Sequence, residues 1–105
     1  MRGEVPGRVL TPYGEGRVVL GFYANGALAV QLIADDGEVI TKLSVNLVDE
    51  AHTLGEKEFF AKVWSDNERI APAALASGLF EDTGRRVKTG FVEAQVWSVV
   101  GELPR

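Results

Sequence analysis

The sequence predicts an α+β fold in which a twisted antiparallel sheet of about five to six strands packs against one short helix. Three observations lead to this prediction. Asn25-Gly26 and Asp36-Gly37, two strong hairpin signals, separate three apolar stretches within residues 17–48. Apolar residues then recur at helical spacing within residues 66–78. Residues 85–100 show a second strand pattern around a turn and predict a C-terminal hairpin.

The composition is typical of one globular domain spanning residues 1–105. The chain is 46% hydrophobic and 25% charged, which is enough for one core. The absence of cysteine excludes disulfides, thiolate zinc sites and a cysteine nucleophile. No apolar run approaches the roughly 20 residues that span a bilayer, and the N-terminus shows no signal-peptide pattern. We therefore expect a cytoplasmic protein that does not enter a membrane.

Residues 1–14 are expected to form an N-terminal arm, and residues 17–48 a three-stranded meander. In the first hairpin, a three-residue loop that places Gly26 in the left-handed region keeps the large apolar residues on one face. A two-residue turn would divide them between both faces. The preferred loop pairs Phe22 with Leu28, Leu20 with Val30, and Val18 with Leu32.

The second hairpin is predicted to turn at Asp36-Gly37 alone. This turn pairs Leu32 with Thr41, Val30 with Leu43, and Leu28 with Val45. The opposite face of the meander mixes polar and apolar side chains, which predicts a partly exposed surface. That face carries Arg17, Val19, Tyr23, Gln31, Ile40, Lys42, Ser44 and Asn46.

The helix is predicted over residues 66–78. A serine at Ser65 with Glu68 three residues later matches a capping box, and Gly78 provides a left-handed stop. Pro72 lacks an amide donor, so either it kinks the helix or the regular part begins near Ile70.

Strands are predicted on both sides of this helix. Residues 58–64 form the fourth strand, Asp82-Thr83-Gly84 a turn, and residues 85–100 the C-terminal hairpin. A turn at Thr89-Gly90 places Arg86 opposite Glu93. On this register Val92, Ala94, Val96 and Val100 face the core, and Phe91, Trp97 and Val99 face the other side.

The chemistry-bearing residues do not form a catalytic pattern. His52 is the only histidine and lies in a polar connector, where a surface role is expected. Carboxylate pairs such as Asp35-Asp36 fall in turns, which favour aspartate for backbone reasons. We therefore expect no catalytic residue, no cofactor and no metal site.

Arg85 and Arg86 are the strongest polar candidates, because guanidinium groups suit planar contacts with phosphate or carboxylate. The structural interpretation instead pairs Arg86 with Glu93 and Arg85 with a local acid such as Asp82. The sheet pattern does not place four aromatic residues in the first core: Trp64, Trp97, Phe91 and Tyr23. They would form a second core layer beneath the helix, or else anchor a partner or stack a base. The candidate interaction residues are Trp64, Asp66, Asn67, Glu68, Asp82, Arg85, Arg86, Phe91 and Trp97.

The stretch from Glu58 to Trp97 resembles a family of small bacterial domains carried on phages, plasmids and other mobile elements. The resemblance rests on the segments FFAKVWSDNE, residues 59–68, and EDTGRRVKTGFVEAQVW, residues 81–97, together with the Tyr-Ala-Asn-Gly hairpin before them. The family has no assigned activity. The resemblance implies a context in which small accessory proteins bind host machinery, including inhibition of immune systems such as CRISPR-Cas.

The leading hypothesis is therefore a non-enzymatic protein-interaction module of a mobile genetic element, an inhibitor of a host defence system, with a host or phage protein as its partner. The alternative is a small-ligand or nucleic-acid binding domain that uses Arg85, Arg86 and Lys88 with Trp64 or Trp97. The net charge of −4 disfavours nucleic acid. A third hypothesis is a small enzyme. Homodimerisation through an edge strand or a patch of Phe91 and Trp97 stays open.

Overall fold

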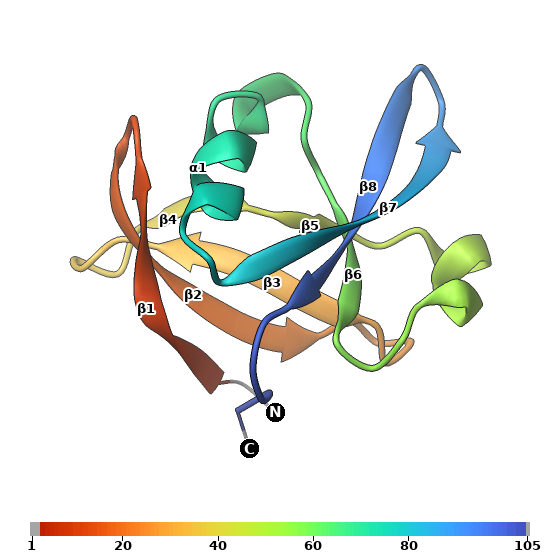
Figure 1. Cartoon of the computed structure of the whole chain (residues 1–105), viewed down its shortest axis with the longest axis horizontal. Coiled ribbons are helices and arrows are strands. Elements are labelled where there is room, and N and C mark those ends of the chain that lie inside the picture. Colours follow the sequence, from red (N-terminus) through yellow and green to blue (C-terminus); the bar gives the residue numbers. More distant parts are fainter. Residues whose placement is uncertain (1–2, 105) are drawn as a thin grey trace.

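The computed structural model describes residues 3–104, which form two four-stranded antiparallel sheets and one short α-helix (Figure 1). The first sheet has the order β1-β2-β3-β4 and the second the order β5-β6-β8-β7. The strands are β1 (Gly3–Thr11), β2 (Gly14–Phe22), β3 (Leu28–Ile33), β4 (Val39–Lys42), β5 (Ser44–Val45), β6 (Glu58–Ala61), β7 (Phe80–Thr89) and β8 (Val92–Val99). The helical segments are the 3₁₀ turns η1 (Val48–Thr53) and η2 (Ser65–Asn67) and the helix α1 (Ile70–Ala76).

The mixed fold class is confirmed, but the predicted single sheet of five to six strands is wrong. Eight strands divide between two sheets. One reason is that the predicted N-terminal arm contains β1, which pairs with β2 along its length; residues 1–2 of that arm lie outside the described residues. The irregularity between Val5 and Arg8 adds two residues to β1, so Val5 and Val9 stay on the same face and both lie in the core. Between them stands Pro6-Gly7-Arg8, so the segment lacks the alternating apolar pattern by which a strand is recognised.

The first hairpin has the predicted register. Phe22 lies opposite Leu28, Leu20 opposite Val30 and Val18 opposite Leu32, with Gly26 at φ 85°. The Tyr23 N–H donates to the Ala27 carbonyl at 2.8 Å, which closes the three-residue loop.

The second hairpin reaches its predicted pairing by a different route. The Ala34 N–H donates to the Glu38 carbonyl at 2.8 Å, so the loop has three residues and the two-residue turn is wrong. Between Leu32 and Ile33 the register shifts, because β4 has one extra residue there. Leu32 therefore lies opposite Thr41, as predicted. The extra residue is Ile40, which packs against the core instead of lying on the outer face.

The predicted pairing of Leu28 with Val45 is also wrong, because the third strand of the meander changes sheet at Leu43. The Leu43 N–H donates to the Val30 carbonyl of the first sheet at 2.9 Å. The Leu43 carbonyl accepts from the Lys62 N–H, just after β6 of the second sheet, at 2.8 Å. Beyond this residue Val45 pairs with Phe60.

Asn67 fixes this crossing from the side and is itself fully buried. Its side-chain Nδ2 donates to the Lys42 and Lys62 carbonyls, both at 2.9 Å, and its Oδ1 accepts from the Thr41 hydroxyl. The side chain therefore connects β4 to the segment that follows β6.

The helix is shorter than predicted. No side-chain capping bond forms at Ser65 or Arg69, and Ser65 has φ 57°. The segment containing Asn67 is a 3₁₀ turn, and α1 begins at Ile70. Pro72 is then the third helical residue, in the first turn, where no amide donor is needed. The alternative in which regular helix begins near Ile70 is therefore confirmed, and Gly78 supplies the left-handed stop at φ 77°.

The C-terminal hairpin begins before residue 85. Asp82-Thr83-Gly84 is a bulge inside β7, with Gly84 at φ 89°, and not a turn. The hairpin turns at Gly90-Phe91, so Thr89 lies opposite Val92 and Arg86 opposite Gln95 instead of Glu93. This shift moves each pair by two positions on one strand, which leaves the faces of the hairpin unchanged.

The larger core fills the space between the sheets and contains Phe59, Phe80 and Trp97, whose ring centroids are 5.6–6.1 Å apart. A smaller core of Phe60, Ala94 and Val96 lies on the other face of the second sheet. Strands β6 and β8 are thus buried on both faces, which explains why Phe59 and Phe60 are both inside. Trp97 belongs to the main core together with Ile70, Ala71 and Ala74 of α1, so the prediction that it lies outside the first core, in a separate second layer, is wrong.

Removing the Asn67 side chain should destabilise the whole fold. In Asn67→Ala, the Lys42 and Lys62 carbonyls and the buried Thr41 hydroxyl lose their bonds to Asn67, and we expect a loss of about 2–4 kcal/mol in the free energy of unfolding. Urea denaturation followed by tryptophan fluorescence measures it. Glu68→Ala, an exposed neighbour, is the control and should change stability by less than about 0.5 kcal/mol. Equal effects of the two substitutions would contradict the role of Asn67.

Candidate functional site

The two candidate arginines are both engaged within the fold. Arg86 makes a bidentate ion pair with Asp82, at 2.9 and 2.8 Å, across the β7 bulge. Arg85 forms an ion pair with Glu58 and donates to the Thr53 carbonyl at 3.0 Å. Each arginine therefore has an acidic partner, as the structural interpretation expected, but the partners differ from the predicted Glu93 and Asp82.

The Asp82–Arg86 pair shifts both groups toward their charged forms. The hydrogen bond from Arg86 is the main reason that the pKa of Asp82 lies below its usual value, and the Gly84 N–H adds to it. The same hydrogen bond raises the pKa of Arg86. The pair lies on the surface, where such contacts stabilise a fold by less than about 1 kcal/mol.

The candidates around the 3₁₀ turn η2 do not form one surface. Asn67 is interior, Trp64 is half-buried against the smaller core, and Glu68 is exposed. Asp66 pairs with Lys62 at 2.9 Å, and the hydrogen bond from Lys62 lowers the pKa of Asp66. Asn67 is therefore a structural residue, and the acids beside it lie in solvent.

Of the two aromatic candidates in the C-terminal hairpin, one is buried and the other is exposed. Trp97 is completely buried, and its indole N–H donates to Gln95 Oε1 at 2.8 Å. It is therefore not available to a partner. Phe91 is fully exposed at the hairpin tip, which projects from the body of the molecule (Figure 1).

The geometry of the turn requires a glycine at position 90 but does not require an aromatic residue at position 91. Gly90 has φ 62° and occupies the first central position, as a type II′ turn requires, whereas the second central position accepts many residues. A polar residue would serve the turn equally well. Beside the tip, a hollow of about 320 Å³ lies between residues 46–50 and the end of β7, and the exposed Val48 lines it together with Lys88 and Thr89.

The outer face of the first sheet carries a feature that sequence reasoning missed. A hollow of about 330 Å³ lies where Gly21 pairs with Ala29, and Val19, Tyr23 and Gln31 also line it. The register predicted from the sequence already placed these small residues opposite each other. No local sequence pattern indicates that the side chains around these two residues leave a hollow between them.

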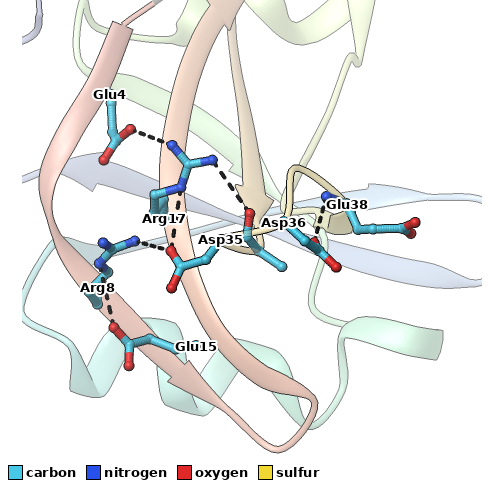
Figure 2. A network of polar contacts seen from close by, with 8 residues as sticks. Glu4, Arg8, Glu15, Arg17, Asp35, Asp36 and Glu38 are labelled. Carbon is cyan, nitrogen blue, oxygen red and sulfur yellow. Dashed lines mark hydrogen bonds and ion pairs between the residues drawn. The ribbon is translucent and has the colours of Figure 1, made fainter.

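Next to it, charged side chains hold the strands β1 and β2 to the β3–β4 turn (Figure 2). Arg8 donates to Asp35 at 2.9 Å and lies 3.5 Å from Glu15, and Arg17 donates to Glu4 at 2.9 Å. Three acids thus surround two arginines. The cluster ties the edge of the sheet together and presents no uncompensated positive charge to an anion.

Two further classes of feature, metal-binding clusters and membrane-spanning helices, are absent from the part of the chain that the structure describes. Within residues 3–104, no three His, Asp or Glu side chains gather closely enough to hold a metal ion. Over the same residues, no helix has the length and hydropathy needed to cross a membrane. His52 is exposed, as expected.

Comparisons with known proteins do not indicate a function, so the proposals below are argued from the geometry of the structure. No protein-family model, no curated protein and no solved structure matches this chain.

Neutralising Asp82 should weaken the fold in a pH-dependent way. The pKa of Asp82 in the folded protein lies below 3.8, the value of an unperturbed aspartate. Ionised Asp82 therefore stabilises the fold above pH 3.8, and its contribution disappears as the pH falls through the folded pKa. We expect Asp82→Asn to lower the free energy of unfolding by no more than about 1 kcal/mol at neutral pH. Asparagine keeps an acceptor for the Gly84 N–H, so the variant isolates the charge.

The check is urea denaturation of both proteins at neutral pH and at an acidic pH below the folded pKa of Asp82, which itself lies below 3.8. The stability difference should be present at the first and absent at the second. Glu81→Gln, at an exposed neighbouring position, serves as the control. A difference that persists in acid would show that Asp82 acts through packing and not through its charge.

Proposed function

We propose that this protein is a protein-interaction module whose β7–β8 hairpin inserts Phe91 into a pocket of its partner. The observation that carries the proposal is the complete exposure of Phe91 at a turn position where the backbone makes no demand for an aromatic residue. Buried aromatic residues contribute a large share of the binding energy at protein interfaces. The residues on both sides of the turn are paired in the β7–β8 hairpin, Thr89 with Val92. This pairing limits the positions that Phe91 can take before binding, which reduces the entropy lost on association.

The surroundings of Phe91 support a protein partner. Val48 is exposed in the neighbouring hollow, with Asp49, Glu50 and Lys88 at its border. An apolar centre with charged groups around it is the usual composition of a protein interface. Phosphate binding by Arg85 or Arg86, in contrast, would have to break their ion pairs with Glu58 and Asp82.

The resemblance to domains of mobile elements suggests the class of partner. On that basis we propose a component of a bacterial defence system, such as a CRISPR-Cas protein, whose activity the bound module would inhibit. This part of the proposal rests on analogy with small accessory proteins and not on the chemistry of any residue.

Replacing Phe91 should abolish binding without affecting folding. Tagged wild-type protein, Phe91→Ser and Tyr13→Ser are each purified from bacterial lysate, and the eluates are analysed for proteins and for nucleic acid. Tyr13 is a matched control because it is an exposed aromatic residue, 59% accessible, in the β1–β2 turn. We expect wild type and Tyr13→Ser to retain the same stoichiometric partner, and Phe91→Ser to recover at least about tenfold less.

Thermal unfolding of Phe91→Ser should match that of wild type, since the ring contacts solvent. Equal recovery of the partner by Phe91→Ser would reject the hairpin as the docking element. Nucleic acid in the wild-type eluate, lost on charge reversal of Arg85 and Arg86, would favour the alternative function. An assay of phage or plasmid immunity then tests the class of partner, because an inhibitor should suppress immunity and its Phe91→Ser variant should not.

A further inference from the structure

The hollow on the outer face of the first sheet is shaped by three successive cross-strand rows. In the middle row Gly21 faces Ala29, so at most one methyl group rises from the sheet. Val19 and Gln31 form the row on one side, and Tyr23 stands on the other. Because the middle row is low and its neighbours are tall, a space of about 330 Å³ remains. This volume lies within the range of small-molecule sites, about 300–1,000 Å³.

The wall formed by Tyr23 is held in place. Its hydroxyl hydrogen-bonds with Ser44 Oγ at 2.9 Å, and Ser44 Oγ also accepts the Val30 N–H at 2.8 Å. Ser44 is buried at the start of β5. The hollow is therefore formed in advance of any ligand, which favours binding because little conformational freedom is lost.

The polar groups at the rim are donors that the fold leaves available. Gln31 and Lys42 are cross-strand neighbours and both line the hollow. Among residues 3–104, Lys42 makes no ion pair and the Gln31 side chain makes no hydrogen bond. The acid of the same row, Glu4, lies beyond Val19 and is bound to Arg17 at 2.9 Å. Lys42 thus brings a positive charge, and Gln31 an amide, to the border of a hollow whose floor is formed by Gly21 and Ala29.

We propose that this hollow binds a small carboxylic acid with an apolar body. The carboxylate accepts hydrogen bonds from the Lys42 ammonium and the Gln31 amide, and these bonds are strengthened by charge. The apolar body lies on Gly21 and Ala29, between Val19 and Tyr23. The site is distinct from the Phe91 hairpin, and its function is independent of the partner proposed for that hairpin.

Benzoate is a suitable probe, because it joins a carboxylate directly to one ring. Amide chemical shifts are followed by NMR during titrations with benzoate, with neutral benzyl alcohol and with cationic benzylamine. We expect benzoate to give saturable shifts centred on Gly21, Ala29 and Tyr23, and the other two probes to bind at least about tenfold more weakly.

Two variants separate the parts of the site. Lys42→Met keeps the side-chain length and removes the charge, and it should weaken benzoate binding about tenfold or more. Ala29→Leu fills the hollow and should abolish the shifts. Lys88→Met, at an exposed lysine of β7, is the control and should bind like wild type.

Several results would overturn the proposal. These are the absence of saturable shifts at the hollow, equal binding of benzoate and benzyl alcohol, or equal weakening by Lys42→Met and Lys88→Met. If Ala29→Leu loses the dispersed amide spectrum of a folded protein, the comparison between the two lysine variants decides the result.

Discussion

The architecture depends on a single backbone crossing at Leu43. Its N–H is bonded to the first sheet and its carbonyl to the segment that continues the second. A buried peptide group cannot lose such partners without a free-energy cost of about 1–3 kcal/mol for each unsatisfied group. Asn67 and Ser44 reinforce the crossing from two sides by hydrogen-bonding to Lys42, Lys62 and Val30. The chain can therefore build two sheets around one core without a long connection between them.

This arrangement also determines which side chains face a ligand or partner. Strands β6 and β8 of the second sheet are covered on both faces by the two cores, so Trp97 is withdrawn from the surface. The first sheet is covered on one face only, and its outer face stays open around Gly21 and Ala29. What the second sheet presents is its hairpin tip with Phe91. The two proposed sites therefore lie on different sheets, and either can fail in experiment without the other.

The charged side chains mainly support the fold. Arg85 connects β7 to Glu58 of β6, and Arg86 braces the β7 bulge through Asp82. At the first sheet, Arg8 and Arg17 hold the β3–β4 turn against β1 and β2 (Figure 2). A protein with a net charge of −4 thus uses several of its arginines internally. This distribution is consistent with a module that docks through shape and an aromatic anchor, since within residues 3–104 four of the five arginines already have acidic partners.

The sequence by itself determined what depends on neighbouring strands and local turn chemistry: the first hairpin with its register and the left-handed stop at Gly78. The Leu32–Thr41 pair was also predicted, although by a turn that the structure replaces with a longer loop and a bulge. Only the tertiary structure decided the strand β1, the change of sheet at Leu43, the burial of Asn67 and Trp97, and the outer-face hollow. The physical reason is that these features arise from contacts between segments far apart in the chain, and local periodicity carries no information about such contacts.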